Sequence, residues 1–203
     1  MQKIIFATGN AGKMKEIRMI LSDLVMQGEP VEIFSMKEAG LSVDIVEDGK
    51  SFLENAVIKA KATAACVEGA IVLADDSGLE IDYLNKEPGI YSARYMGEDT
   101  PYHVKNANLI GRLDGVPDAE RTARFVCAIA CVLPDGTVLS TEATIEGRIG
   151  YEEKGINGFG YDPIFQVPEF GKSTAELTEE EKNEISHRGK ALRAMKEKLK
   201  ALA

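Results

Sequence analysis

The residues best suited to chemistry are carboxylates, cations and Gly-rich segments that follow apolar runs. The first such segment is Thr8-Gly9-Asn10-Ala11-Gly12-Lys13, between an apolar run and a helical pattern. Small residues let backbone N–H groups approach a ligand, a helix N-terminus favours an anion, and Lys13 adds a positive charge. Its spacing is not that of a Walker A loop, because Met14 occupies the place of the metal-binding Ser or Thr. The segment is equally consistent with a phosphate site and with a capped surface turn.

Acidic residues form a second set of candidates. Asp75 and Asp76 follow the apolar run 70–74, and neighbouring side chains at a strand end point in different directions, which leaves one for a ligand. Mg²⁺ takes one or two carboxylates together with substrate phosphates. Glu47 lies in an acidic loop, and Lys59 on the following helical segment could bind phosphate beside a metal. The alternatives are an ordinary polar turn at 75–78, a solvated acidic loop and an exposed helix face.

An aromatic loop forms the third candidate. Phe159-Gly160-Tyr161-Asp162 combines rings with a carboxylate, which suits stacking on a flat ring while hydrogen bonding to its polar edge. Lys182, His187 and Arg188 follow within two helical turns. Core aromatics in a tight turn and a surface His-Arg pair are the alternatives.

Covalent catalysis and a zinc site are the weaker expectations. Cys66, Cys127 and Cys131 are odd in number and lack C-x-x-C spacing, so we expect structural thiols. The two histidines form no triad with them. A nucleotide bound with a metal is the smallest ligand that would use phosphate, carboxylate and aromatic sites together.

The elements that must position these residues alternate between strand and helix. Apolar runs predict strands at residues 3–7, 31–34, 70–74 and 79–83, with an acidic corner at 75–78. Helical spacing and capping signals, including Ser51-x-x-Glu54 and Thr178-x-x-Glu181, predict helices at 12–24, 55–67, 100–113 and from 178 onward, with a break near Gly189. Residues 122–133 and 137–149 read as a long hairpin turning at Pro134-Asp135-Gly136. The pattern predicts an α/β protein with a mixed sheet flanked by helices.

Composition limits the partners. The chain has 203 residues and a formal net charge of −9, although its two ends are net basic around an acidic middle. A negative protein repels polynucleotides, so no nucleic-acid partner is expected, whereas one small anion is compatible with the basic ends. No apolar run approaches the ~18 residues of a membrane helix, so we expect a globular cytoplasmic protein with no membrane partner.

Taken together and in order, several motifs resemble the inosine triphosphate pyrophosphatase family. They are Thr8 to Lys13, Ser51-Phe52-x-Glu54-Asn55-Ala56, Ala74 to Leu79, Pro88 to Tyr95, Gly158 to Asp162 and Ser186 to Gly189. The resemblance covers essentially the whole chain, read as one domain, 1–203. It implies an elongated mixed sheet, two lobes around a central substrate cleft, and a homodimer. It also implies Mg²⁺-dependent hydrolysis of the non-standard purine nucleotides ITP, dITP and XTP to the monophosphate and pyrophosphate, which removes them from the nucleotide pool.

The resemblance assigns roles residue by residue. Glu47 and Asp76 would hold Mg²⁺, and Asp76 would also accept a proton. Phosphates would be held by Thr8, Asn10 and Lys13, within the loop that includes Gly9, Ala11 and Gly12, with help from Lys59. The nucleotide would contact Ser77, Phe159, Gly160, Tyr161, Asp162, Lys182, His187 and Arg188, with Phe159 stacking on the base.

A rival hypothesis is a non-catalytic nucleotide sensor that retains the pocket. The presence of Lys13, Glu47 and Asp76 argues against it. Product analysis separates the two, because an enzyme releases pyrophosphate or phosphate and a sensor releases neither. The sequence leaves open the ranking of ITP, dITP and XTP, the atom that excludes GTP, and the dimer interface.

Overall fold

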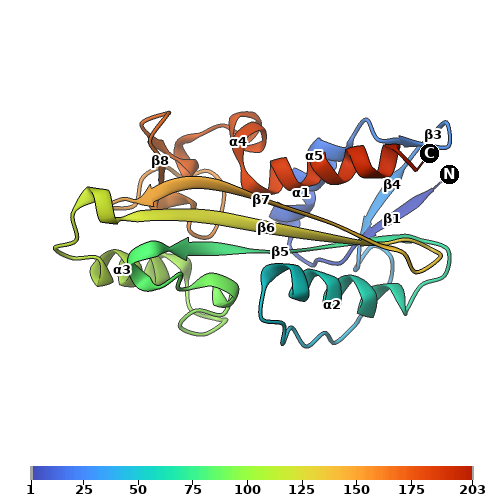
Figure 1. Ribbon diagram of the computed structural model, residues 1–203, viewed down its shortest axis with the longest axis horizontal. Coiled ribbons are helices and arrows are strands. Elements are labelled where there is room, and N and C mark those ends of the chain that lie inside the picture. Colours follow the sequence, from blue (N-terminus) through green and yellow to red (C-terminus); the bar gives the residue numbers. More distant parts are fainter. Residues whose placement is uncertain (1, 203) are drawn as a thin grey trace. The chain divides into compact units, whose positions relative to one another are not determined.

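A computed structural model describes residues 2–202 as an α/β protein with a seven-stranded mixed sheet, in the order β4-β1-β5-β6-β7-β8-β9, and a separate β2-β3 pair (Figure 1). The predicted class is confirmed. The strands are β1 Lys3–Phe6, β2 Val25–Met26, β3 Glu29–Pro30, β4 Glu32–Ser35, β5 Ile71–Ile81, β6 Thr122–Val132, β7 Val138–Ile149, β8 Phe165–Val167 and β9 Lys172–Ser173. The helices are α1 Ala11–Leu21, α2 Phe52–Ala64, α3 Tyr102–Arg112, α4 Glu179–Ile185 and α5 His187–Lys200.

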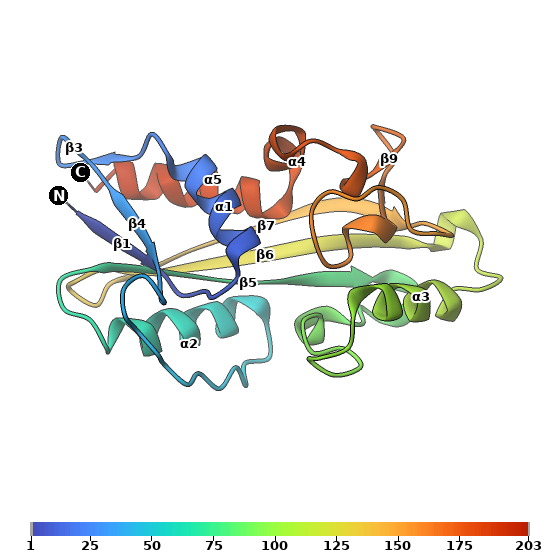
Figure 2. The ribbon, with the colours of Figure 1, turned by 180° about the vertical axis from the view of Figure 1, so that it is seen from behind.

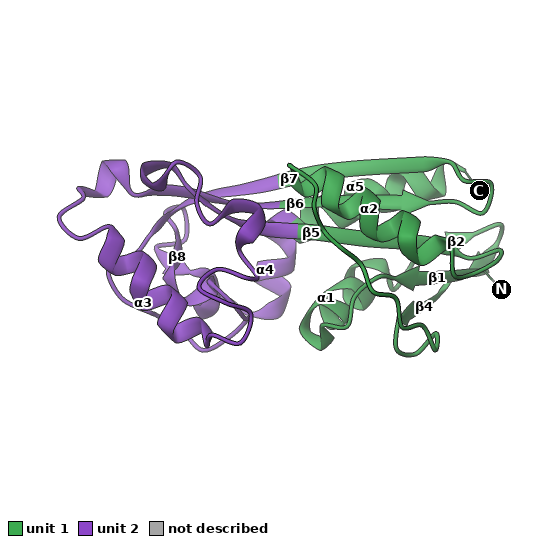
Figure 3. Ribbon diagram, turned by 90° about the horizontal axis from the view of Figure 1, so that it is seen from below, with its two compact units in different colours: residues 1–76, 127–143, 188–203 green, residues 77–126, 144–187 purple. Residues whose placement is uncertain are grey.

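The chain divides into two compact units (Figure 3). Unit 1 contains residues 1–76, 127–143 and 188–203, and unit 2 contains residues 77–126 and 144–187. Strands β5, β6 and β7 each contribute residues to both units. Segments far apart in sequence therefore build each core.

Unit 1 is a sheet covered by helices on both faces. Its strand β1 pairs in parallel with β4 and β5, as expected for strands joined through helices. Helices α1 and α5 lie on one face and α2 on the other (Figures 1 and 2). The core on the α1 and α5 face joins buried side chains of these two helices and of strands β1, β5 and β6, among them Phe6, Ile17, Leu73, Ile129 and Leu192.

Unit 2 packs α3 and the segment after β7 around its own core. Leu79, Leu109, Phe125, Ile164 and Phe165 are among its buried residues. The unit also contains a buried cation, Arg121, whose guanidinium donates to the carbonyls of Leu113, Ile149 and Gly150 at 2.7–2.9 Å. These bonds replace the water that burial removes.

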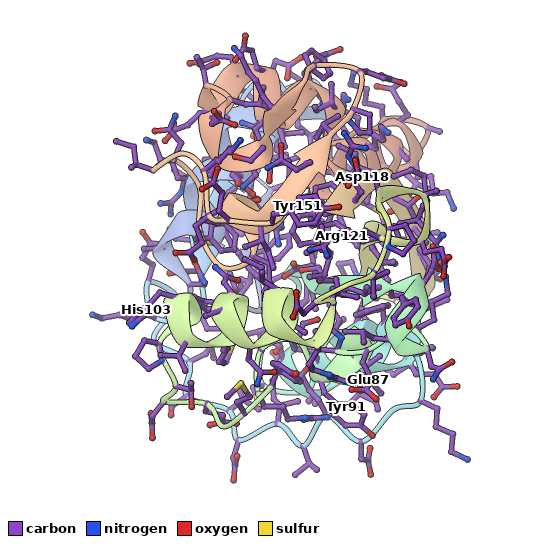
Figure 4. The ribbon with its side chains drawn as sticks, turned by 90° about the vertical axis from the view of Figure 1, so that its left-hand side faces the viewer. Glu87, Tyr91, His103, Asp118, Arg121 and Tyr151 are labelled. Carbon is purple, nitrogen blue, oxygen red and sulfur yellow. The ribbon has the colours of Figure 1, made fainter. Side chains whose placement is uncertain are left out.

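The surface side of unit 2 is seen in Figure 4. Tyr151 lies against Arg121, with its ring centroid 4.2 Å from the guanidinium, and its hydroxyl donates to Asp118. His103, on α3, is exposed and points away from the unit.

Capping accounts for where several helices begin. The Asn10 side chain caps α1, the Ser51 hydroxyl caps α2, and Thr178 and Glu181 form the predicted capping box of α4. At α2 the box is incomplete, because Glu54 accepts from the backbone N–H of Lys50 rather than from that of Ser51.

The predicted acidic corner at 75–78 is wrong. Strand β5 runs without interruption from Ile71 to Ile81, with Asp75 and Asp76 inside it. Cations beside Asp75 neutralise the charge that would otherwise oppose burial in a strand.

Short elements were also misplaced or missed. Strands β2, β3, β8 and β9 have only two or three residues, too few to show a period. The C-terminal helix breaks at Ser186, earlier than Gly189, because Ser186 is extended and its N–H caps α4 by bonding to Lys182. Among the described residues, no helix is both long and apolar enough to cross a membrane.

Candidate active site

Residues 8–10 connect β1 to α1 in unit 1, and residues 11–13 form the first turn of that helix. The Asn10 side chain accepts from the Lys13 N–H at 3.0 Å, and the Thr8 hydroxyl accepts from the Asn10 N–H at 3.1 Å. Gly9 and Asn10 are exposed, so the loop meets solvent at the positive end of the helix. The geometry is compatible with a bound anion.

Four charged side chains of unit 1 alternate in sign beside this loop. Lys13 Nζ lies 3.0 Å from Asp75 Oδ2, and Arg188 Nε lies 3.4 Å from the same oxygen. The other end of Arg188 lies 2.6 Å from Glu16 Oε2. A buried aspartate and a glutamate thus fix the directions of two cations.

Asp75 remains ionised at the centre of this chain. Burial alone would raise its pKa, but the charges of Lys13 and Arg188 outweigh it and hold the pKa of Asp75 below its usual range. The pKa of Arg188 is raised: burial would lower it, but Asp75 and Glu16 have the greater effect. Asp75 is therefore a structural counter-ion for the predicted substrate-binding cations.

Asp76 points toward the other side of β5. Its Oδ2 accepts from the Asn55 amide of α2 at 3.0 Å, whereas Asp75 contacts residues of α1 and α5 on the opposite face. Burial raises the pKa of Asp76, and the charges of Glu47 and Asp75 add to that rise. The alternation expected of neighbouring strand residues thus separates a buried structural carboxylate from a half-buried one suited to chemistry.

Asn55 connects Asp76 to the acidic loop. This side chain is 1% exposed, and its Oδ1 accepts from the Gly49 N–H at 2.9 Å while its amide donates to Asp76. Gly49 is needed at this point, because a Cβ there would lie 2.7 Å from Asn55 Oδ1. One amide therefore holds the loop that carries Glu47 against the strand that carries Asp76.

The donor set around Glu47 suits a hard cation. Lys59 Nζ lies 3.0 Å from Glu47 Oε1 and donates to the Asp75 carbonyl at 3.1 Å, so a positive group already lies against these oxygens. Within residues 2–202, no three His, Cys, Asp or Glu side chains gather as metal ligands. Glu47 and Asp76 are two carboxylates whose charges interact, and Mg²⁺ takes one or two carboxylates when phosphates complete its shell. The residues fit that cation.

In unit 2, Asp162 organises the aromatic loop. Its carboxylate accepts from the Phe159 N–H at 2.8 Å, from the Thr174 hydroxyl at 2.8 Å and from Lys182 Nζ at 2.7 Å. Gly158 has φ +73°, and a Cβ on it would overlap Asp162 Oδ2. The carboxylate closes the loop onto itself, with both Asp162 and Lys182 buried.

The loop presents an aromatic ring beside a cation. Phe159 is 37% exposed, and Lys182 Nζ lies 4.8 Å from its ring centroid. Tyr161 is buried instead, and its hydroxyl donates to the Ser92 carbonyl at 2.6 Å. His187 stacks on Phe125 with ring centroids 4.9 Å apart, and Ser77 is half-buried in β5.

The structure brings the predicted residues together in two groups. Unit 1 contains Thr8 to Lys13, Glu47, Lys59, Asp76 and Arg188, and unit 2 contains Ser77, Phe159 to Asp162, Lys182 and His187. The predicted substrate contacts of all these residues, and the central cleft, stay predictions. Three residues were missed as organisers: Glu16, Asn55 and Ser92. All three act through contacts with residues distant in the sequence, which local spacing does not reveal.

Comparison with known proteins gives a consistent result. Residues 4–198 match the Ham1 family. A protein of Exiguobacterium sibiricum called dITP/XTP pyrophosphatase is 48% identical over 193 residues, covering 95% of this chain and 94% of its own. A protein of Clostridium perfringens with the same name is 46% identical and covers 100% of this chain and 99% of its own.

Solved structures of Ham1 proteins are similar to this chain over its whole length. The Ham1 protein of Staphylococcus aureus superposes with a TM-score of 0.86 at 37% identity, covering 100% of both chains. A HAM1 protein of Coxiella burnetii gives a TM-score of 0.86 at 38% identity with the same coverage.

Proposed function

The chain belongs to the Ham1 family, and from that membership we propose that it is a dITP/XTP pyrophosphatase. It hydrolyses ITP, dITP and XTP to the nucleoside monophosphate and pyrophosphate, and so removes them from the nucleotide pool. The observation that carries the proposal is the pair of aspartates in β5. Asp75 fixes two cations on one face, while Asp76 is held half-buried on the other face beside Glu47 and Lys59.

The triphosphate binds to the cationic groups of unit 1. Backbone N–H groups of residues 8–13, the Thr8 and Asn10 side chains and the Lys13 ammonium supply donors to phosphate oxygens. Lys59 adds a second ammonium. Because Asp75 and Glu16 already fix Lys13 and Arg188, little reorganisation is needed when the anion arrives.

Glu47 and Asp76 would hold Mg²⁺ with the substrate phosphates. When bound, the cation neutralises phosphate charge and makes a coordinated water more acidic. Release of Lys59 from Glu47 would free both the carboxylate for the cation and the ammonium for a phosphate.

Asp76 orients the attacking water and accepts its proton. The water oxygen bonds to phosphorus as the anhydride bond between the α and β phosphates breaks, and pyrophosphate leaves with the bridging oxygen. Asn55 holds Oδ2 of Asp76 in one direction, so the remaining oxygen faces the reaction. A metal ligand is a weaker base, so orientation is the larger part of this role.

The nucleobase binds at the aromatic loop of unit 2. Phe159 stacks on the purine, and a donor such as Lys182 reads the keto oxygen at position 6 that hypoxanthine and xanthine share. Ser77, Gly160, Tyr161, Asp162, His187 and Arg188 complete or support the nucleotide site. Adenine presents an amino group there and is rejected because two donors would face each other.

We further propose that the protein works in the cytoplasm as a homodimer, with no nucleic-acid or membrane partner. Sedimentation equilibrium tests this directly. A mass of twice 22.1 kDa is expected, and a monomer at micromolar concentration would overturn the assembly.

Substrate selectivity and one substitution test the activity. We expect kcat/KM for ITP, dITP and XTP to exceed the values for GTP and ATP, and Asp76→Asn to lower kcat at least about 100-fold, as expected for a lost proton acceptor. Asp82→Asn removes a carboxylate in the adjacent turn that bonds to Lys86 and Thr122, and it serves as the matched control. Equal efficiency with GTP and ITP, or normal turnover by Asp76→Asn, would contradict the proposal.

A further inference from the structure

The segment Pro88 to Tyr95 is one of the sequence motifs, yet no role has so far been given to it. In unit 2 it forms a short 3-10 helix, Gly89–Tyr91, followed by Ser92, which is only 4% exposed. Ser92 contacts two other segments of the same unit. Both of those segments contain predicted nucleotide contacts.

The first contact fixes Ser92 to strand β5. Its hydroxyl accepts from the Leu79 N–H at 2.9 Å and donates to the Gly89 carbonyl at 2.6 Å. Leu79 lies two residues after Ser77 in the same strand. Because both hydroxyl bonds are made, the backbone at Ser92 is held at a defined distance from the strand.

The second contact joins Ser92 to the aromatic loop. The Tyr161 hydroxyl donates to the Ser92 carbonyl at 2.6 Å, and both residues are buried. The Tyr161 ring also meets Tyr102 edge-on, with centroids 5.2 Å apart. Tyr161 therefore anchors the loop to Ser92, while Asp162 accepts a hydrogen bond from the Phe159 N–H within the loop.

The position of Phe159 depends on both Tyr161 and Asp162. Phe159 is separated from Tyr161 by Gly160, which has φ +67°, and it follows Gly158 with φ +73°. Two glycines leave the backbone free to choose other conformations unless neighbouring residues are fixed. Tyr161 and Asp162 supply this restraint, together with the Asn106 amide of α3, which donates to the Gly160 carbonyl at 3.3 Å.

We propose that Ser92 and the Tyr161 hydroxyl form a positioning pair that holds Phe159 in place for the nucleobase. Ser92 bonds to strand β5 through its hydroxyl and to Tyr161 through its carbonyl, so it keeps the loop in a fixed position relative to the strand. Tyr161 acts as a buried anchor and does not touch the base. The role at the base rests on the proposed function, whereas the restraint on Phe159 is a property of the nucleotide-free chain.

A fluorescence measurement tests the restraint without any nucleotide. The chain contains no Trp, so Phe159→Trp creates a single reporter at the tip of the loop. In that protein, Tyr161→Phe is expected to raise the acrylamide quenching constant about twofold and to lower the anisotropy, because the loop loses an anchor. Ser92→Ala should act in the same direction.

A matched control removes a tyrosine hydroxyl elsewhere in unit 2. The Tyr95 hydroxyl donates to Asn108 at 2.7 Å and accepts from Arg112 at 2.9 Å, so Tyr95→Phe deletes hydrogen bonds to α3 rather than to the loop. It is expected to leave the reporter unchanged. If Tyr161→Phe leaves the reporter as unchanged as Tyr95→Phe does, the restraint is absent and the proposal is overturned.

Steady-state kinetics with the native Phe159 test the consequence for the base. Tyr161→Phe is expected to raise KM for ITP roughly three- to tenfold with little change in kcat, the size expected when one buried hydrogen bond is lost. Inorganic tripolyphosphate has no base, so its inhibition constant should stay within about twofold of the parent value. An equal weakening of ITP and tripolyphosphate would indicate general damage and overturn the proposal.

The fluorescence and kinetic measurements distinguish failure of the proposed function from failure of the positioning role. A parent protein that does not hydrolyse ITP would refute the proposed function, while the fluorescence result would still decide whether Ser92 and Tyr161 restrain the loop. A changed reporter together with an unchanged KM for ITP would refute the role of the pair in base binding.

Discussion

Asn55 shows how much one uncharged side chain can contribute to a charged site. Its amide oxygen holds Gly49 and its amide nitrogen holds Asp76, so both predicted metal ligands depend on it. No other residue described in unit 1 makes both of these bonds. Its burial means that each half of the amide must find a partner, which fixes the orientation of the group.

Asn55→Asp should therefore disable the site without removing any ligand. The new carboxylate would face Asp76 Oδ2 where an amide now donates at 3.0 Å, and like charges at that distance repel. We expect kcat/KM for ITP to fall at least tenfold and the free energy of unfolding to fall by about 1–3 kcal/mol, the usual penalty for a buried unsatisfied group. Kinetics and urea titration measure both.

An exposed position supplies the control for that substitution. Asn108→Asp introduces the same charge on α3, where Asn108 is exposed and accepts from Tyr95. It should change activity by less than about twofold. Full activity of Asn55→Asp would show that Asn55 does not orient Asp76.

For Asp75 and Asp76, the sequence predicted the side-chain directions correctly but the secondary structure wrongly. Their opposite directions follow from strand geometry. The sequence suggested a turn at 75–78, however, because Asp, Ser and Gly favour turns in isolation. Neutralisation of Asp75 by Arg188, 113 positions later in the chain, reverses that preference, and only the tertiary structure reveals it.

At the scale of elements, the loop around Phe159 depends on a glycine that no other residue can replace. Gly158 has φ +73°, and a Cβ would overlap Asp162 Oδ2. Gly158→Ala should destabilise the protein by about 1–2 kcal/mol from the backbone alone and by about 1–3 kcal/mol more from crowding. It should also raise KM for ITP.

Gly115→Ala separates the two contributions. Gly115 has nearly the same φ, +72°, but nothing lies within 4 Å of its missing Cβ. Chemical denaturation of both variants should show the smaller loss for Gly115→Ala, with normal KM. Equal losses of stability and equal KM values would mean that Asp162 does not enforce the loop.

The junction of α1 and β4 carries a pH-dependent contact. A hydrogen bond from Arg18 and further bonds from Ser35 lower the pKa of Glu38 from its usual 4.5 to about 2. Because the folded-state pKa is depressed, the stabilisation is fully present above pH 4.5 and is lost as the pH falls toward 2. Glu38→Gln should be less stable than the parent at pH 7.

Thermal unfolding between pH 7 and pH 3 tests that linkage. The difference in Tm between Glu38→Gln and the parent should shrink steadily below pH 4.5. Glu142→Gln, at another exposed carboxylate, is the control and should show no such trend. A difference independent of pH would contradict the assigned pKa of Glu38.

Long elements were predictable and short ones were not. The hairpin of β6 and β7 was expected at 122–133 and 137–149, because β-branched runs flank a Pro-Asp-Gly turn, and the structure places it within one residue of those bounds. Strand β8 depends on pairing with β7, and β9 depends on pairing with β8, so neither has a local signal. The predicted Ser51 cap is confirmed, but the Glu54 carboxylate accepts from the backbone N–H of Lys50 and not from that of Ser51.

At the scale of the whole molecule, the core explains the behaviour of the cysteines. Burial raises the pKa values of Cys127 and Cys131 to about 12, whereas Cys66 is exposed. At pH 8 a thiol-specific disulfide reagent should modify one cysteine in the native protein and all three in guanidinium. Peptide mass mapping should identify Cys66; rapid native reaction at Cys127 would contradict the packing.

The family resemblance implied two lobes, but the boundaries of the two units could not be predicted from the residue pattern. Strands β5, β6 and β7 each run without a break from one unit into the other, so no linker marks the change. The net charge of −9 led us to expect no polynucleotide partner, but it concealed the paired cations of unit 1. Those cations could bind a small polyanion, and in its absence the carboxylates of Asp75 and Glu16 neutralise their charge.

The proposed reaction cleaves a nucleoside triphosphate between its α and β phosphates. Phosphorus NMR of the reaction with XTP and Mg²⁺ tests it most directly. One pyrophosphate signal should grow in step with the monophosphate, and Asp76→Asn should abolish both. Release of inorganic phosphate with a nucleoside diphosphate, or no product at all, would contradict the claim.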